Sequence, residues 1–441
     1  MRFLVFLVCT GMLFSACTDV TLPLPLPLAT EQRIDVGTGW AKTSINATVF
    51  RKNSVVTYHD MQFIAYYDKD GNVIVGRRNL RDKNWELKRT QYKGNVSDAH
   101  NVISLMADGD GYLHLAWNHH YTSLHYCRST EPYGLTFTGM LSMTGNREKA
   151  ITYPEFYRLR NGNLLFIYRD ASSGPINIVV NSYDITTKKW SRLQNNLIGG
   201  DGGRSPYWQA CIDSAGTIHI SWVWRENSGV ETNHDMCYAR SGDGGKTWEK
   251  STGEKYTLPI KVANAEYALH IPQQSDLINQ TSMCADDEGH PYIATYFKDP
   301  GAIAPQYHII YKVKDEWEVY NVGFRTKNFN LSGEGTRNIP ISRPQIIFSN
   351  NTGKKFAAII FRDEERGDKV SAAVCNDLQY MDWQLVDLTN ESVGAWEPTY
   401  DTELWKEKGV LNLFIQKVSQ GDFDGRTGMS PQKVWVLEWQ P

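Results

Sequence analysis

A short pattern recurs seven times between Val36 and the end of the chain, and it limits the folds that the chain can adopt. Each copy has a polar turn with a glycine, and then a short apolar strand rich in β-branched and aromatic residues. The glycine supplies the positive φ that a tight hairpin turn needs. The seven glycines are Gly71, Gly111, Gly162, Gly216, Gly289, Gly353 and Gly409. Their spacing of 40 to 73 residues fits one four-stranded propeller blade per copy, with insertions.

Tryptophans between these hairpins mark a second element, an outer strand. They occur at Trp85, Trp190, Trp248, Trp317 and Trp383. Residues 241–248 match the S-x-D-x-G-x-T-W turn, or Asp-box, of sialidase-type propellers, in which the side chain of the Asp (here Asp243) holds the turn and is not catalytic. No long stretch shows a helical period. The sequence therefore predicts an all-β protein, a seven-bladed β-propeller.

The N-terminal segment predicts export. Arg2 precedes an apolar run that ends in Leu-Phe-Ser-Ala-Cys17, which resembles a bacterial lipoprotein cleavage box. We expect residues 1–16 to be a signal peptide, residues 17–35 a lipidated Cys17 with a Pro/Leu-rich spacer, and residues 36–441 a single propeller domain. A plain signal peptide is the alternative. The predicted location is the periplasm or outer-membrane surface of a bacterium, as a secreted protein or an anchored lipoprotein.

The composition argues against several classes of protein. The 441 residues carry 46 Lys and Arg against 49 Asp and Glu, which leaves no basic excess for nucleic acid. No later segment approaches about 18 consecutive apolar residues, so the membrane is reached only through the lipid anchor. Five cysteines remain beyond Cys17, and their wide spacing predicts mostly buried thiols rather than a disulfide framework. No organic cofactor is expected.

Polar residues near the central axis are the candidates for chemistry, because propellers bind ligands where their loops converge. Four histidines lie within 21 residues, at His100, His114, His119 and His120. His114 lies in an apolar strand and is expected to pack there, whereas His100 lies in a turn-forming run. His119 and His120 are adjacent and would face opposite ways on a strand. At most one of those two therefore points at the axis.

Two residues of the next repeat complete a candidate catalytic set. Tyr153 precedes Pro154 and is expected to have an extended backbone. Arg169 ends an apolar strand, where a guanidinium is costly unless it meets an anion. With a histidine, these groups are what β-elimination of a uronate requires: Arg pairs with the carboxylate, His or Tyr removes the C5 proton, and Tyr or His protonates the departing O4 oxygen. No pair of carboxylates for ordinary glycoside hydrolysis stands out.

The chain resembles the BNR-4 group of secreted bacterial seven-bladed propellers in runs that include VSDAHN, GYLHLAWNHH, TYPEF, FIYRDASSG and IHISWVWRE. That group includes propeller-type ulvan lyases and, more distantly, α-L-rhamnosidases that release rhamnose from glucuronic acid. The lyase site has two His and a Tyr and Arg at characteristic spacings, matched here by His100 and His120, 20 residues apart, and by Tyr153 and Arg169, 16 apart. The resemblance implies that these four are catalytic, with His120 preferred to His119.

The resemblance also implies a substrate. It is an acidic oligo- or polysaccharide that contains rhamnose, ulvan-like or of the arabinogalactan type, cleaved at O4 of glucuronic acid. An α-L-rhamnosidase is the alternative enzyme: its catalytic His lies in the first blade on the opposite face, where this chain has Gln62, with His59 close by. A glycan-binding propeller without catalysis is the second alternative.

Other residues near the ends of the predicted inner strands carry the aromatic rings, guanidinium groups and amides that grip sugars. The predicted substrate-binding residues are Asn101, Asn118, Arg204, Tyr207, Trp224, Arg225 and Arg343. Core packing and ion pairing between blades are the alternative for the Trp and Arg residues.

A structural zinc site is a separate prediction. His234, Cys284, His290 and His308 fall in consecutive predicted blades, and N and S ligands suit tetrahedral zinc. The resemblance to the lyases, which carry a structural zinc, implies one here as well. Four separately hydrogen-bonded side chains are the alternative.

Overall fold

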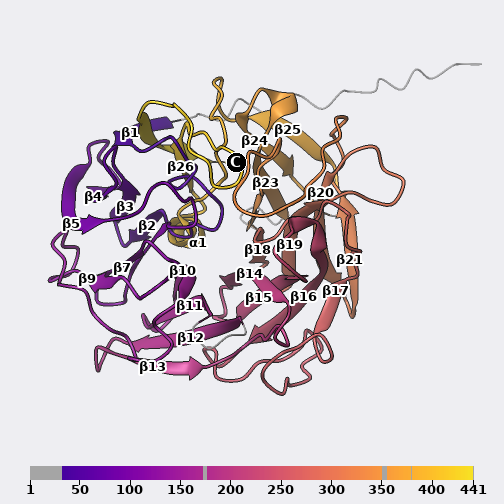
Figure 1. The fold of residues 1–441 in the computed structure, drawn as a ribbon, viewed down its shortest axis with the longest axis horizontal. Coiled ribbons are helices and arrows are strands. Elements are labelled where there is room, and N and C mark those ends of the chain that lie inside the picture. Colours follow the sequence, from indigo (N-terminus) through magenta and orange to yellow (C-terminus); the bar gives the residue numbers. More distant parts are fainter. Residues whose placement is uncertain (1–31, 172–175, 350–354, 379, 441) are drawn as a thin grey trace, which may run out of the picture.

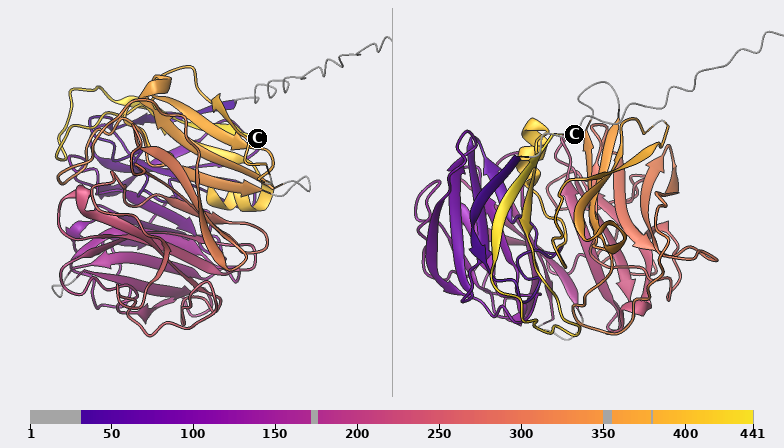
Figure 2. Two further views of the ribbon diagram at one scale, coloured as in Figure 1. Left: turned by 90° about the vertical axis from the view of Figure 1, so that its right-hand side faces the viewer. Right: turned by 90° about the horizontal axis from the view of Figure 1, so that it is seen from above.

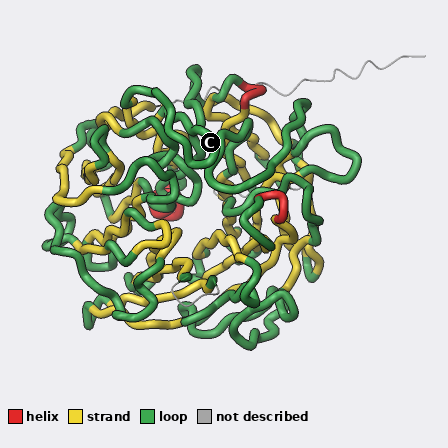
Figure 3. The backbone as a smooth tube through the Cα atoms, in the orientation of Figure 1, coloured by secondary structure: helices red, strands yellow, loops and turns green. Residues whose placement is uncertain are grey.

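The computed structural model describes residues 32–171, 176–349, 355–378 and 380–440. These residues form seven β-sheets around a central axis, so the predicted seven-bladed propeller is confirmed (Figure 1). Strands make up the blades, and loops connect them (Figure 3). The predicted signal peptide, residues 1–16, and the lipidated Cys17 lie outside the described residues.

The first four blades follow the order of the chain. Blade 1 contains β2 (Val55–Tyr58), β3 (Met61–Tyr67), β4 (Asn72–Asn79) and β5 (Glu86–Lys93). Blade 2 contains β6 (Ile103–Ala107), β7 (Leu113–Trp117) and β9 (Tyr126–Arg128). Blade 3 contains β10 (Ile151–Arg158), β11 (Leu164–Asp170), β12 (Asn177–Asp184) and β13 (Lys189–Gln194), with β8 (His120–Thr122) added beside β10. Blade 4 contains β14 (Ser205–Ile212), β15 (Ile218–Arg225), β16 (Asn233–Ser241), β17 (Glu266–Leu269) and the short η1 (Val230–Thr232).

The remaining blades complete the ring. Blade 5 contains β18 (Ser282–Ala285), β19 (Pro291–Phe297), β20 (Gln306–Val313) and β21 (Glu316–Asn321). Blade 6 contains β22 (Gln345–Ser349), β23 (Phe356–Asp363), β24 (Lys369–Cys375), β25 (Trp383–Asp387) and the short η2 (Glu364–Arg366). Blade 7 contains β26 (Leu411–Gln416), β27 (Gln432–Trp439) and β1 (Gln32–Gly39), and the helix α1 (Thr402–Lys408) precedes β26.

The two ends of the described chain close the ring. β1 pairs antiparallel with β27, from Gln32 opposite Glu438 to Gly39 opposite Gln432. The N-terminal strand is thus the outer strand of the last blade, and the chain that follows it leads into the first blade (Figure 1). β1 begins four residues before position 36, so residues 32–35 belong to the propeller and not to the spacer.

The repeated glycines turn hairpins in most blades. Gly111, Gly162, Gly216 and Gly289 each join the first strand of a blade to the second, with φ between 80° and 94°. Gly71 instead lies between β3 and β4, and Gly353 lies outside the described residues. Gly409 does not turn a hairpin, because it ends α1 in the left-handed conformation with φ 63°. Asp401 caps the start of that helix by accepting a hydrogen bond from the Leu404 amide.

The turn at residues 241–248 is held by its aspartate. The Asp243 carboxylate accepts hydrogen bonds from the backbone amides of Lys246 and Thr247 and from the Thr247 hydroxyl. Trp248 is buried beneath this turn, and its indole donates to the Gly245 carbonyl. These hydrogen bonds stay within the turn, as a structural role of Asp243 requires.

Two cavities lie at opposite ends of the axis. Seen from the side, the strands of the blades run between two opposite faces of the molecule (Figure 2). One cavity, of about 600 Å³, is lined by residues at the amino ends of the inner strands, and the other, of about 640 Å³, by residues at their carboxyl ends and by α1. None of the helices formed by the described residues is long and apolar enough to cross a lipid bilayer.

Candidate active site

The cavity at the amino ends of the inner strands contains all four predicted catalytic residues. His100 lies in the loop before β6, His120 begins β8, Tyr153 lies in β10, and Arg169 lies near the end of β11. The predicted preference within the His pair agrees with this geometry. His120 lines the cavity, whereas His119 is buried and its Nε2 accepts a hydrogen bond from the His125 amide.

A strand exchange between blades brings these residues together. β8 leaves the second repeat and pairs with β10 of blade 3, with His120 opposite Thr152. β10 then departs from regular pairing with β11 between Thr152 and Glu155, which is a β-bulge. Tyr153 sits in this bulge with φ 56°, so the predicted extended backbone is wrong at this residue. Positive φ at a bulky residue is strained, and such strain concentrates at functional sites.

One carboxylate orients both histidines. Asp98 Oδ1 lies 2.7 Å from His100 Nδ1, and Asp98 Oδ2 lies 2.5 Å from His120 Nδ1. The two imidazole rings stack with their centroids 4.1 Å apart. Because both Nδ1 atoms face Asp98, the Nε2 atoms are the ones left for a ligand.

The protonation states follow from this arrangement. Burial lowers the pKa of His100, and the neighbouring His120 adds to that effect, although the hydrogen bond to Asp98 opposes it. Burial would raise the pKa of Asp98, but hydrogen bonds from both histidines outweigh it and hold that pKa well below its usual value. The lowered pKa favours the neutral imidazole of His100, with a charged carboxylate behind it, which is the arrangement that a general base requires.

Arg169 lies among three tyrosine rings. Its guanidinium carbon lies 4.7 Å from the ring centre of Tyr153 and 5.3 Å from those of Tyr121 and Tyr207. Nη2 donates to the Tyr121 hydroxyl at 3.2 Å, whereas the buried Nε and Nη1 have no hydrogen-bond partner. Buried donors without partners are rare in folded proteins, and Arg169 is one of the residues that line the cavity. Its fork therefore has hydrogen-bonding capacity that no group of the protein uses.

The tyrosines of the cavity differ in acidity. Burial raises the pKa of Tyr153, so this phenol stays protonated. Burial also favours the neutral form of Tyr207, but the guanidinium groups of Arg169 and Arg225 outweigh it and lower the pKa of Tyr207. Arg225 lies 5.4 Å from the centre of that ring. Tyr153 is thus suited to donate a proton, and Tyr207 is the more easily ionised phenol.

The other predicted binding residues divide into two groups. Tyr207, Arg225 and Arg343 line the cavity. Arg343 is already paired, with its Nε and Nη2 2.8 and 2.6 Å from the two carboxylate oxygens of Glu397. That fork is closed to a substrate carboxylate, so Arg343 supports the cavity floor.

Four predicted binding residues are absent from the lining of this cavity, and each has a structural role. Asn101 is buried, and its Nδ2 donates to the Asn95 carbonyl. Asn118 accepts a hydrogen bond from the Asn95 amide, so both asparagines shape the loop that holds His100. Arg204 pairs with Glu226 at 2.8 Å. Trp224 is fully buried in β15, in the core rather than at a sugar.

The predicted zinc ligands are not brought together. His234 pairs with Glu226 and Asp235, and His308 pairs with Asp299. Cys284 lines the other cavity. His290 is half-exposed and lies beside Asp286 and Glu288. Together these three residues form one of the two groups, among the described residues, whose three ligand atoms all lie within 4.8 Å of one another. The prediction of a four-ligand site is therefore wrong, because each of the three histidines instead pairs with a carboxylate of the same or a neighbouring segment.

The second such group is Asp98, His100 and His120. Both imidazoles turn Nδ1 toward the carboxylate itself, which is the geometry of hydrogen bonding rather than of shared coordination. This arrangement favours the two histidines as acid or base groups.

The first-blade residues of the rhamnosidase alternative lie outside both cavities. Gln62 is fully buried, donates to Asp401 and Asn412, and accepts from Arg78. His59 contacts the Tyr133 hydroxyl at 3.1 Å. Neither residue is part of the lining of the two cavities.

Sequence reasoning missed several residues of the cavity. Asp98 could have been found, because it lies two residues before His100 and accepts its backbone amide, a local turn pattern. Tyr121 directly follows His120. Phe50 and Asp424 come from distant loops, and nothing in their local sequence indicates that they meet His100, Phe50 by ring stacking and Asp424 by a carboxylate 3.6 Å away.

Comparison with known proteins identifies the family of the chain. Residues 61–325, more than half of the chain, match the profile of the BNR repeat-containing family. The chain belongs to this family.

Its relatives include carbohydrate-active enzymes. The chain is 25% identical over 195 residues to "Ulvan lyase, long isoform" of Pseudoalteromonas sp. (strain PLSV), a match that covers 40% of this chain and 19% of that protein. The crystal structure of polysaccharide lyase Uly1 superposes with a TM-score of 0.66 at 16% identity, covering 94% of this chain and 100% of that one. A PL25 ulvan lyase structure gives 0.64 at 12% identity, covering 93% and 96%. At these identities the structures establish a shared fold.

Proposed function

We propose that this protein is a polysaccharide lyase that cleaves at O4 of glucuronic acid in a rhamnose-containing acidic glycan and leaves a 4,5-unsaturated uronate. The observation that carries the proposal is the Arg169 fork, which is buried, has two unpartnered donor atoms and lies within one cavity with a neutral His100 and a protonated Tyr153. Similarity to ulvan lyases supports it, including a PL25 structure described as bound to -[GlcA(1-4)Rha3S]-.

The groups divide the reaction as follows. Arg169 pairs with the uronate carboxylate and stabilises the charge that spreads into it as C5 loses its proton. His100 Nε2 takes that proton, while Asp98 stabilises the imidazolium that forms. The electron pair of the C5–H bond becomes the C4–C5 double bond, the C4–O4 bond breaks, and the Tyr153 hydroxyl protonates O4. His120 shares Asp98 with His100 and binds the sugar.

Incubation with glucuronate glycans tests the proposal. We expect ultraviolet absorbance from the unsaturated uronate, its loss in His100→Ala and Tyr153→Phe, and its retention in His290→Ala, which changes an exposed histidine outside the cavity. Free rhamnose without that absorbance would indicate the rhamnosidase, and binding without either product would indicate a glycan-binding propeller. If His100→Ala stays active and Tyr207→Phe does not, Tyr207 is the base.

We also propose that the enzyme is exported, with its acidic glycan as partner. Mass spectrometry of the mature N-terminal peptide would reveal whether Cys17 is first and acylated.

A further inference from the structure

Two loops meet at the rim of the catalytic cavity. One consists of residues 322–344, between β21 and β22, and the other of residues 417–431, between β26 and β27. The Thr336 amide donates to the Asp424 carboxylate at 2.8 Å, and the Asp424 amide donates to the Thr336 carbonyl at 3.1 Å. The loops are thus joined by backbone as well as side-chain contacts.

An exposed aromatic ring and an arginine face each other at this junction. Phe423 is 65% exposed, and the Arg337 guanidinium carbon lies 4.3 Å from the centre of its ring. Both residues line the cavity that contains His100 and Arg169. Phe423 and Asp424 have φ of 55° and 59°, a conformation that is costly for residues with side chains. This combination of strain and exposure at the mouth of the cavity indicates a functional role for Phe423.

Arg337 has no direct ion-pair partner in the described part of the chain. Glu231 interacts with its charge only at longer range, and the buried Nε of Arg337 has no hydrogen-bond partner. Two other cavity arginines are paired instead, Arg343 with Glu397 and Arg362 with Asp368. Among the described residues, Arg337 is therefore a third cavity arginine without an ion-pair partner, besides Arg169 and Arg225.

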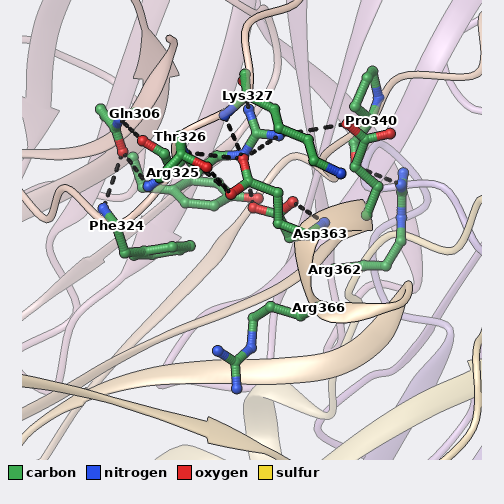
Figure 4. Close-up of polar contacts among 12 residues, drawn as sticks. Gln306, Phe324, Arg325, Thr326, Lys327, Pro340, Arg362, Asp363 and Arg366 are labelled. Carbon is green, nitrogen blue, oxygen red and sulfur yellow. Dashed lines mark hydrogen bonds and ion pairs between the residues drawn. The ribbon is translucent and has the colours of Figure 1, made fainter. Parts of the chain in front are cut away.

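The loop that carries Arg337 is anchored at both ends (Figure 4). At its start, Arg325 Nε lies 2.7 Å from Asp363, and both side chains are fully buried. At its end, Arg362 donates to the carbonyls of Ile339 and Pro340 at 2.9 and 3.0 Å. Because the anchors fix the loop before a ligand arrives, little conformational entropy is lost when Arg337 binds one.

We propose that Phe423 and Arg337 form a second sugar subsite, which binds a pyranose that carries an anionic substituent next to the uronate that is cleaved. The inference rests on the proposed function. The open face of Phe423 packs against the C–H face of the sugar, and the Arg337 fork pairs with a carboxylate or sulfate ester. The subsite adjoins the reacting centre, because Asp424, the neighbour of Phe423, lies 3.6 Å from His100 Nδ1.

Calorimetry with three matched oligosaccharides tests the subsite: a glucuronate oligosaccharide whose neighbouring sugar is sulfated, its desulfated form, and one whose neighbouring sugar carries a carboxylate. We expect Arg337→Met to weaken binding of a charged form about tenfold, as loss of a charge-assisted hydrogen bond does, and to leave the desulfated form unchanged. The charged form that responds identifies the anion. Phe423→Ala should weaken all three forms.

Two controls make the result decisive. Arg33 stacks on Trp435 at 4.5 Å in blade 7, away from the cavity, so Arg33→Met removes a similar stack and should change none of the affinities. Arg337→Lys keeps the charge and should retain part of the discrimination. Equal weakening of charged and desulfated forms by Arg337→Met, or none at all, would overturn the subsite. Binding is measured with or without cleavage, so this failure is distinct from an absence of lyase activity.

Discussion

Asp98 holds two histidines with one carboxylate, and this makes it the residue on which the base depends. It contacts no part of the substrate in the proposed mechanism, so its role is one of positioning. Asp98→Asn keeps the size and an acceptor oxygen but loses the charge that raises the pKa of His100. We expect kcat to fall about 100-fold, because general-base catalysis contributes about that much.

The pH profile separates this role from a merely structural one. Without the carboxylate, the pKa of His100 falls further, so the acidic limb of kcat/KM should move to lower pH. An unchanged limb would show that His100 is not the titrating base. The thermal midpoint of the variant serves as a check that the loop is still folded.

Arg169 is the second residue whose replacement gives a clear result. Arg169→Lys keeps the charge but loses the planar fork and its stacking among three tyrosines. We expect about 10²–10³ less turnover, the usual effect of removing an oxyanion-type contact. The thermal midpoint should change little, because two of the fork's donor atoms make no internal hydrogen bond. If turnover were unchanged, the uronate carboxylate would have to be held elsewhere, with Arg225 the next residue to test.

At the scale of single residues, residue types and the resemblance to the lyases, whose spacings this chain matches, indicated the catalytic candidates but not their surroundings. Tyr153 illustrates the limit: Pro154 favours an extended backbone, whereas pairing on both sides of β10 forces a bulge. Asn101 and Asn118 looked like sugar ligands but shape a loop, because short amides satisfy backbone groups equally well.

At the scale of elements, the glycine turns were predictable where local chemistry decides the structure. The prediction of a hairpin turn was wrong at Gly409, because a helix that begins at the Asp401 cap, and not a strand, precedes this glycine. The exchange of β8 into blade 3 could not be predicted either, since it depends on tertiary contacts with Thr152.

One of these turns also fixes how two blades pack. Gly162 has φ 85°, and a Cβ placed on it would lie 2.7 Å from the Gly109 backbone of blade 2. We expect Gly162→Ala to destabilise the protein by about 1–3 kcal/mol, seen as a lower thermal midpoint, with activity per folded molecule unchanged.

Gly253→Ala is the matched control for this turn. Gly253 has a similar φ of 86°, but nothing lies within 4 Å of its Cβ position. It should cost only the backbone strain. Equal losses for the two variants would show that the contact between the blades contributes nothing.

At the scale of the whole molecule, the axis is built by residues from different blades. Lys52 comes from the loop before β2, Glu155 from β10, and the Thr281 carbonyl, which accepts from Lys52 at 3.3 Å, from the residue before β18. Glu155 is fully buried, one of its oxygens has no partner, and Tyr157 donates to the other. Lys52, Glu155 and Thr281 come from three different repeats, so sequence patterns within one repeat do not reveal this arrangement.

The buried carboxyl group of Glu155 predicts how the stability of the protein depends on pH. Burial raises the pKa of Glu155 from 4.5 to about 7, although Lys52 opposes the shift. A carboxyl group whose pKa is raised by folding stabilises the protein below its unfolded pKa, and that contribution is lost as pH rises through the folded value. Between about pH 4.5 and 7, the wild type should therefore lose up to about 3 kcal/mol of unfolding free energy relative to Glu155→Gln, which cannot ionise.

Thermal midpoints at pH 5 to 8 would measure the difference, with Glu316→Gln on exposed β21 as control. Parallel midpoints for wild type and Glu155→Gln across this range would show that Glu155 is ionised, with Lys52 as its counter-ion, throughout.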